Sequence, residues 1–132
     1  MKESYCFPCI IRYSNEEDLF YVHFPDIEEA FTDGKTFKEA LYNAKDVLGL
    51  VLYEREQMGR EIPEYEDTLI KTKENETVSL VEVWMPLVRD RIESKSIKKT
   101  LTIPKWLNDI AEKEQVNYSQ ILQAALKNYL NL

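Results

Sequence analysis

The sequence predicts an α+β fold in two parts, a body of residues 1–88 and a tail of residues 97–132, joined by a linker over residues 89–96. In the body, segments rich in aromatic and β-branched residues flank one long stretch with helical apolar spacing. In the tail, the pattern changes to one short alternating segment followed by two short helical stripes. The charge changes as well, because residues 1–93 carry 11 Lys+Arg against 21 Asp+Glu and residues 94–132 carry 6 against 3. This asymmetry indicates two partners of opposite electrostatic character.

The composition is that of an ordered, soluble protein. The 132 residues are 44% hydrophobic and 31% charged, with three Gly and five Pro, which argues against a disordered or fibrous chain. No segment approaches the roughly 20 apolar residues of a membrane span. The N-terminus, MKESYCFPC, lacks the apolar segment of a secretory signal. We therefore expect a cytoplasmic protein that does not bind a membrane.

The body begins with three predicted strands. The first runs from Tyr5 to Tyr13, and Pro8 within it indicates an edge strand or a bulge. The second is LFYVHF (19–24), after the polar turn SNEED. The third runs from Glu29 to Thr32, before the turn signal Asp33-Gly34-Lys35.

A long helix follows these strands. Thr36 and Glu39 form a T-x-x-E capping box, and Gly59 ends a helix that continues to about Met58. Its apolar stripe consists of Phe37, Ala40, Leu41, Ala44, Leu48, Val51 and Leu52. We expect this stripe to be the face that covers the sheet.

The rest of the body is a charged loop over residues 60–77 and a last strand, VSLVEVWM (78–85), stopped by Pro86. The body is thus predicted as β-β-β-α-β, with one long helix on one face of the sheet. RDRIESKS (89–96) is polar and has no clear period, so we assign it as the linker.

The tail is predicted as β-α-α. Lys99 to Ile103 alternates polar and apolar residues, and Pro104 suits the first turn of a helix that ends near Gln115. Asn117 and Gln120 form an N-x-x-Q cap for a second helix. The stripe of that second helix consists of Ile121, Leu122, Ala125, Leu126, Tyr129 and Leu130.

Such a small tail needs a partner. Chains below about 40 residues rarely bury enough apolar surface alone, and a single strand leaves an open edge. Two copies that pair their strands antiparallel remove both problems. The expected dimer core consists of Leu101, Ile103, Leu107, Ile110, Ile121 and Leu122.

The paired strands would form a two-stranded ribbon, which fits the major groove of DNA. Lys98, Thr100 and Thr102 would point outward from it toward the bases, with Lys99 beside them. The free amides at the start of the second helix, Asn117 to Ser119 with Tyr118 between them, would hold a phosphate.

KKTLTIP followed by WLNDIAEKEQVNYSQILQAAL resembles a ribbon-helix-helix DNA-binding domain over nearly all of residues 97–130. The resemblance implies that Lys98, Thr100 and Thr102 read bases. The chain departs from the family in its threonines, because such domains often place Arg or Asn in the groove. The alternative is a β-α-α appendage that only dimerises.

The body also resembles a known family. FYVHFPDIEEAFTDGKTFKEALYNAKDVL is similar to the HicB-type antitoxin pattern, with matches at Phe24-Pro25-Asp26, Thr32 to Gly34, Thr36, Glu39 to Leu41 and Asn43-Ala44. The chain departs where the family usually has Pro-Gly-Cys, since Glu28-Glu29-Ala30 stands there.

The resemblance implies an antitoxin of a type II toxin–antitoxin system that needs no cofactor. Its partial RNase H-like body would bind and mask a HicA-type ribonuclease toxin, and its tail would repress the operon as a homodimer, with a dimer of dimers also allowed. A ribonuclease that grips RNA is basic, so an acidic body would attract it. Asp26, Glu28 and Glu29 are our candidates for part of that surface.

Two alternatives remain open. One is a metal-dependent RNase H-like nuclease, which would need Asp26, Asp46 and Asp67 to converge on metal ions, and nothing in the sequence indicates that they do. The other is a stand-alone ribbon-helix-helix repressor whose body senses a small ligand.

Cys6 and Cys9 spell CFPC, a pattern found in redox and zinc sites. A redox pair needs its first Cys at a helix N-terminus, whereas a strand continues here. Zinc would need two more ligands, and the chain has one histidine, His23, and no further cysteine. We expect all three residues to be ordinary strand side chains, with no metal site.

Overall fold

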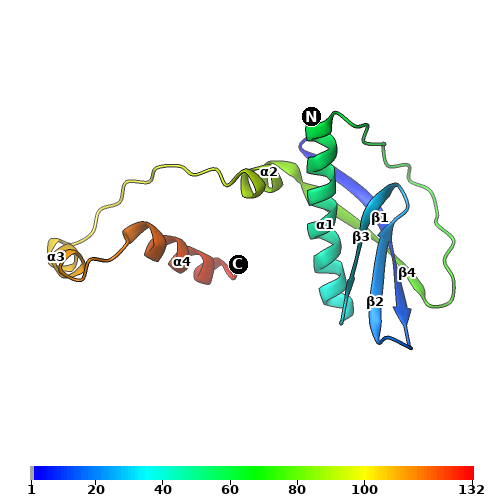
Figure 1. Ribbon diagram of the computed structural model, residues 1–132, viewed down its shortest axis with the longest axis horizontal. Helices are drawn as coiled ribbons and strands as arrows, with labels where there is room; N and C mark the ends of the chain where they lie inside the picture. The colour runs from blue at the N-terminus through cyan, green and yellow to red at the C-terminus, as the bar shows by residue number, and fades with distance from the viewer. Residues whose placement is uncertain (1) are drawn as a thin grey trace. The chain divides into compact units, whose positions relative to one another are not determined.

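The computed structural model describes residues 2–132, which form two compact units. The unit that ends at Lys95 holds β1 (Ser4–Ser14), β2 (Leu19–Phe24), β3 (Ile27–Gly34), α1 (Phe37–Met58), β4 (Glu76–Trp84) and α2 (Met85–Glu93). The unit Ser96–Leu132 holds α3 (Lys105–Lys113) and α4 (Tyr118–Leu130) (Figure 1). None of the helices among residues 2–132 is both long and apolar enough to cross a membrane.

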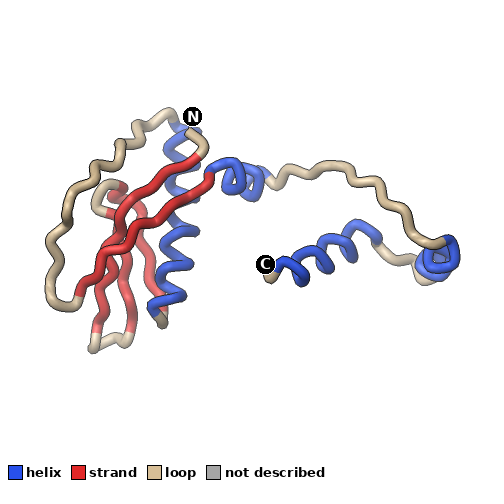
Figure 2. The backbone as a smooth tube through the Cα atoms, turned by 180° about the vertical axis from the view of Figure 1, so that it is seen from behind, coloured by secondary structure: helices blue, strands red, loops and turns tan. Residues whose placement is uncertain are grey.

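The body is an antiparallel sheet with the strand order β3-β2-β1-β4. Helix α1 packs against one face, and the long connection from α1 to β4 runs along the other side of the sheet (Figures 1 and 2). The α+β class predicted from the sequence is therefore confirmed. So is the order β-β-β-α-β within the body.

The core lies between α1 and the sheet. Of the stripe predicted on α1, Ala40, Ala44, Leu48, Val51 and Leu52 are buried at helical spacing, whereas Leu41 is half-buried and Phe37 is 40% exposed. The buried residues meet side chains that alternate along the strands, because successive strand residues point to opposite faces. The sheet supplies Phe7, Cys9, Ile11, Val22, Phe24, Ile27, Ala30, Val81 and Val83, and Met85 completes the cluster. Each large side chain buried there contributes about 1.5–3 kcal/mol.

The entry into α1 depends on a close approach. The Thr36 hydroxyl oxygen accepts a hydrogen bond from the Glu39 backbone N–H at 3.0 Å, as the capping box predicts. Gly34 lies directly against this first turn, since a Cβ built on it would be 2.4 Å from the Ala40 backbone nitrogen. Gly59 ends α1 in the left-handed region at φ 66°, as predicted.

The prediction that residues 89–96 form a linker is wrong for residues 89–93, which are helical. Pro86 lies in the first turn of α2, where its missing N–H costs nothing. Arg89 anchors α2 through a 2.7 Å ion pair with Glu56, whose side chain is only 2% exposed. It also donates a 2.8 Å hydrogen bond to the Lys2 carbonyl. The helix was missed because its short, polar sequence shows no period, and these long-range contacts stabilise it.

The prediction that Pro8 marks an edge strand or a bulge is also wrong, because β1 lies between β2 and β4 and its register with β4 continues through Pro8 without a shift. The ladder with β2 covers only residues Ile10 to Ser14 of β1, whereas the ladder with β4 runs from Ser4 to Arg12. Around Pro8, β1 has β4 alone as its strand neighbour. On the side of a strand that has no neighbour, a proline breaks no ladder hydrogen bond, so its missing N–H is tolerated there.

In the tail, both predicted helices are present, and the Asn117 side chain accepts a 3.0 Å hydrogen bond from the Gln120 N–H. The predicted strand from Lys99 to Ile103 is absent in the single chain, where these residues have no regular secondary structure. A strand needs a ladder, and no second strand exists between Ser96 and Leu132.

We expect Gly34→Ala to lower the free energy of unfolding by about 1–3 kcal/mol, because the added methyl group must push the first turn of α1 away from β3. Urea denaturation followed by circular dichroism measures the change. Lys35→Ala, at the exposed neighbouring position, is the control and should shift stability by less than about 0.5 kcal/mol. Equal effects at the two positions would contradict the close packing of Gly34 against the first turn of α1.

Candidate functional site

The face of the sheet turned away from α1 carries a row of exposed and half-buried side chains. Directly paired residues of antiparallel strands point to the same side. The register pairs Phe31 with His23, His23 with Ile10, and Ile10 with Val78, so these four residues share this face across all four strands. Phe31, on the edge strand β3, is 67% exposed. We call this the open face.

The three acids proposed for toxin binding lie at the start of β3 but do different things. The Arg55 guanidinium donates hydrogen bonds of 2.5 and 2.9 Å to the Glu29 carboxylate, and the Arg60 guanidinium lies 3.1 Å from the same carboxylate. It therefore ties β3 to the C-terminal end of α1. Asp26 and Glu28 are exposed and make no ion pair with residues 2–132. Only these two are available to a partner.

The hydrogen bonds from Arg55 lower the pKa of Glu29 to about 2, and its burial opposes this only partly. The carboxylate form is stabilised by two donors and by the neighbouring Arg60 charge. Glu29 is thus a structural acid that stays ionised well into the acidic range.

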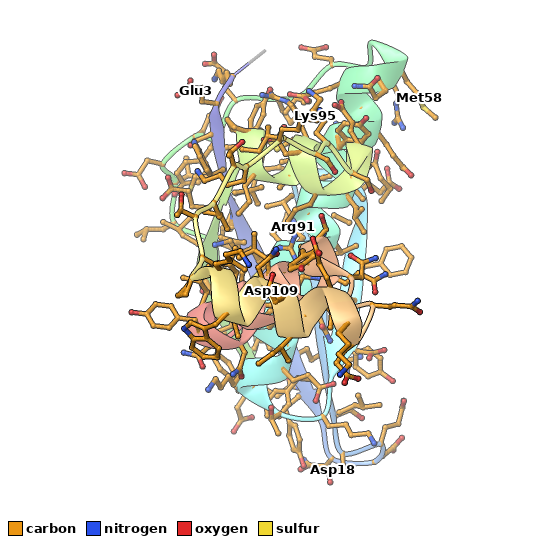
Figure 3. All side chains as sticks on the ribbon, turned by 90° about the vertical axis from the view of Figure 1, so that its left-hand side faces the viewer. Glu3, Asp18, Met58, Arg91, Lys95 and Asp109 are labelled. Atoms are coloured by element: carbon orange, nitrogen blue, oxygen red, sulfur yellow. The ribbon has the colours of Figure 1, made fainter. Side chains whose placement is uncertain are left out.

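Further acids lie at the other end of the body. In Figure 3, Asp18 lies at the tip of the β1–β2 hairpin, far from Glu3 and Met58 at the opposite end. The Tyr13 hydroxyl donates to Asp18 at 2.7 Å, and the Tyr21 hydroxyl donates to Glu17. These bonds raise the pKa of both tyrosines. The acidic surface predicted from composition therefore extends along the body rather than forming one cluster.

A groove of about 270 Å³ separates α1 from α2. Its exposed apolar members include Tyr42, Leu50 and Leu87. Lys45 and Arg91 also line it, together with Asp46, Val83, Trp84, Val88 and Ile92. The groove is not foreseen in the sequence because it depends on α2, which the sequence pattern does not predict.

The residues of the nuclease alternative lie on different elements. Asp26 is in the β2–β3 turn, Asp46 on α1, and Asp67 in the connection to β4, where it accepts a 3.0 Å hydrogen bond from the Tyr65 hydroxyl. Among residues 2–132, no three His, Cys, Asp or Glu side chains lie close enough to hold a metal ion.

The two cysteines point to opposite faces of β1, since they are three residues apart in a strand. Cys9 is buried in the core, and burial raises its pKa to about 11. Burial and the Glu82 charge also raise the pKa of Cys6. A reactive thiol needs a lowered pKa, so these surroundings oppose redox chemistry.

In the tail, the residues proposed to contact DNA lie in two places. Lys98, Lys99, Thr100 and Thr102 are exposed in the segment before α3. Asn117, Tyr118 and Ser119 begin α4, where the first backbone N–H groups of a helix lack intrahelical partners. The Tyr118 hydroxyl donates a 3.0 Å hydrogen bond to the Asn108 side chain, which links α4 to α3.

The residues proposed as the dimer core are not buried in one chain. Leu101 is 59% exposed, Ile110 55% and Ile121 55%, whereas Ile103 and Leu107 are each 41% exposed. Leu122 is half-buried. No described residue from Ser96 onward is buried, so the apolar faces of α3 and α4 lack a core of their own.

No protein-family model and no curated protein sequence matches the chain. Solved structures do. A chain of a toxin–antitoxin complex from Streptococcus pneumoniae is 25% identical with a TM-score of 0.55, and the match covers 96% of this chain and 99% of that one. The Burkholderia pseudomallei antitoxin HicB is 18% identical with a TM-score of 0.52, over 92% of this chain and 95% of that one. The resemblance to HicB-type antitoxins noted in the sequence is confirmed by these neighbours.

We expect Glu29→Gln to reduce the free energy of unfolding at pH 7 by about 1–2 kcal/mol, because it weakens a charged hydrogen-bond pair. The folded-state pKa of Glu29 is about 2, below its usual 4.5. The carboxylate's contribution is therefore complete above about pH 5 and is lost as the pH falls toward 2.

Urea denaturation at pH 7, 5, 4 and 3 should show the difference between wild type and Glu29→Gln shrinking toward pH 3. Glu28→Gln is the matched control, and its curve should follow wild type throughout. A constant difference at every pH would contradict the ion pair as its source.

Proposed function

We propose that this protein is an antitoxin whose body binds and masks a basic, RNA-cleaving toxin of the HicA type, and whose tail represses the operon by binding DNA as a dimer. The observation that carries the proposal is the likeness to a chain of a toxin–antitoxin complex, which covers 96% of this chain and 99% of that one. A match of that extent includes the tail as well as the body.

The charge of the body supports its role as the toxin-binding part. Residues 1–93 carry 21 acidic against 11 basic side chains, and Asp26 and Glu28 are exposed without an internal partner. A protein that binds RNA presents cations to phosphate, so the same cations would be attracted to this surface. Binding there would keep them from RNA. The body needs no catalytic residue for this function.

The exposure of the tail supports its role as a dimer that binds DNA. Two copies would bury Leu101 and Ile103 and give each strand the ladder that it lacks in one chain. Lys98 and Thr100 would then lie on the outer face of the ribbon, where a β-ribbon contacts the major groove. The N-terminus of α4 would hold a backbone phosphate.

A specific observation favours a second candidate. The groove between α1 and α2 is lined by apolar side chains together with the cations Lys45 and Arg91 and the single acid Asp46, which suits a small amphipathic anion. A stand-alone repressor that senses such a ligand would use this groove and would have no toxin.

Purification of the protein from its native operon, with its companion identified by mass, tests the proposal. We expect a small basic protein that cleaves RNA once it is released. If the protein purifies alone while still shifting its own promoter DNA, the antitoxin function is wrong and the repressor alternative is favoured.

We expect Lys98→Ala and Thr100→Ala to weaken operator binding by about 10-fold each, with toxin neutralisation unchanged. Lys98→Ala should also reduce the salt dependence of binding, because it removes one cation near phosphate. Gel shifts over a salt series and an RNA-cleavage assay make the measurements. Lys71→Ala, an exposed lysine of the body, is the control and should leave the operator affinity unchanged.

Leu101→Asp provides the complementary test of the dimer. It places a charge in the shared core, so dimerisation and operator binding should be lost together. Sedimentation and gel shifts make these measurements. If toxin neutralisation is lost with operator binding in Lys98→Ala, body and tail do not act as separate modules.

A further inference from the structure

The edge strand β3 carries an exposed aromatic side chain that packing does not explain. Phe31 points away from α1 and is 67% exposed, and its neighbour His23 is exposed as well. A large apolar side chain that is this exposed on a sheet edge adds nothing to the core. It is the kind of residue that anchors a protein interface.

The outer side of β3 also has free backbone groups. Among residues 2–132, β3 has β2 as its only strand neighbour, so one row of N–H and C=O groups along Ile27–Gly34 has no ladder. Bulges and charged side chains on an edge strand prevent it from pairing with strands of other chains, and this strand has both. Its register with β2 shifts between His23 and Phe24, and exposed carboxylates lie on either side of Phe31.

The charge around Phe31 defines the chemistry of the occupant. Glu28 and Asp33, on the same strand, are exposed and have no ion-pair partner in the described part of the chain. Asp26, in the preceding turn, is likewise exposed and has no such partner there. Glu29, on the same strand, differs from them because it is neutralised by Arg55 and Arg60. A partner with cations placed around an apolar side chain would complement this surface.

We propose that the β3 edge, with Phe31 as the anchor and Asp26, Glu28 and Asp33 around it, is the surface on which the basic toxin docks. The proposal rests on the proposed function and adds the location of the contact. An apolar side chain of the toxin packs against Phe31 and His23. Lysines or arginines around it meet the three carboxylates, and these pairs set the association rate and its salt dependence.

The opposite edge of the same sheet supplies matched controls. Leu80 on β4 is 55% exposed and points to the same side of the sheet, since it pairs with Pro8, two residues from Ile10. Glu82, two residues further along β4, is an exposed acid comparable to Asp33. Variants at these positions change the same chemistry on the same face but at the other edge.

The experiment measures the affinity of the full-length protein for a catalytically inactive toxin from its own operon. Phe31→Ala and Asp33→Lys should each weaken binding at least about 10-fold, with the loss in Asp33→Lys largest at low salt. Leu80→Ala and Glu82→Lys should stay within about 3-fold of wild type. Circular dichroism checks that each variant is folded. If Phe31→Ala does not fold, Glu28→Lys is the second variant that tests binding at β3.

The outcomes separate this proposal from the function on which it rests. If the wild type binds the toxin and both β3 variants bind it equally well, the proposed docking surface is wrong and the proposed antitoxin function is unaffected. If Leu80→Ala and Glu82→Lys lose binding while the β3 variants retain it, the proposed surface is wrong and the toxin contacts the β4 edge instead. Wild type that does not bind the toxin would overturn the function and the docking surface together.

Discussion

One helix covering one face of a four-stranded sheet is the constraint on which the body depends. The buried stripe of α1, from Ala40 to Leu52, closes the inner face, and Gly34 allows the first turn to lie directly on β3. Within the described residues of the body, no second helix is of comparable length, and the connection to β4 runs along the other side of the sheet (Figure 2). The exposed row that includes Phe31 and His23 is a direct consequence of this one-sided packing.

The charged residues of the body divide into those that hold the fold and those that remain available. Glu56 with Arg89 and Glu29 with Arg55 join elements that are distant in the sequence. The Glu56 side chain is only 2% exposed, whereas that of Glu29 is 32% exposed beside an Arg55 that is 11% exposed. Removing one member of such a pair leaves a charge without compensation, so these acids serve stability. Exposed acids without a partner, such as Glu28, contribute little to stability and are free for long-range attraction.

The tail presents the opposite situation, because its parts are regular but have no common core. Helices α3 and α4 form where their apolar spacing predicts, and Asn117 caps α4 as predicted, yet Leu101, Ile110 and Ile121 are each more than half exposed. The segment before α3 has the alternation of a strand but no ladder in one chain. These features support the proposal that a second copy completes the fold of this unit.

The sequence by itself determined most of the elements and their order. Strong local signals, such as the Thr36 cap, the α1 stripe and Gly59, act within a few residues and can be read directly. The acids at 26, 28 and 29 were also found as candidates, but only the tertiary structure decided that Glu29 is held by Arg55 while Glu28 is free. It likewise decided α2, because Arg89 reaches Glu56 only in the folded body. Phe31 was missed for the same reason: its exposure depends on which face α1 covers, a long-range choice that strand alternation alone does not make.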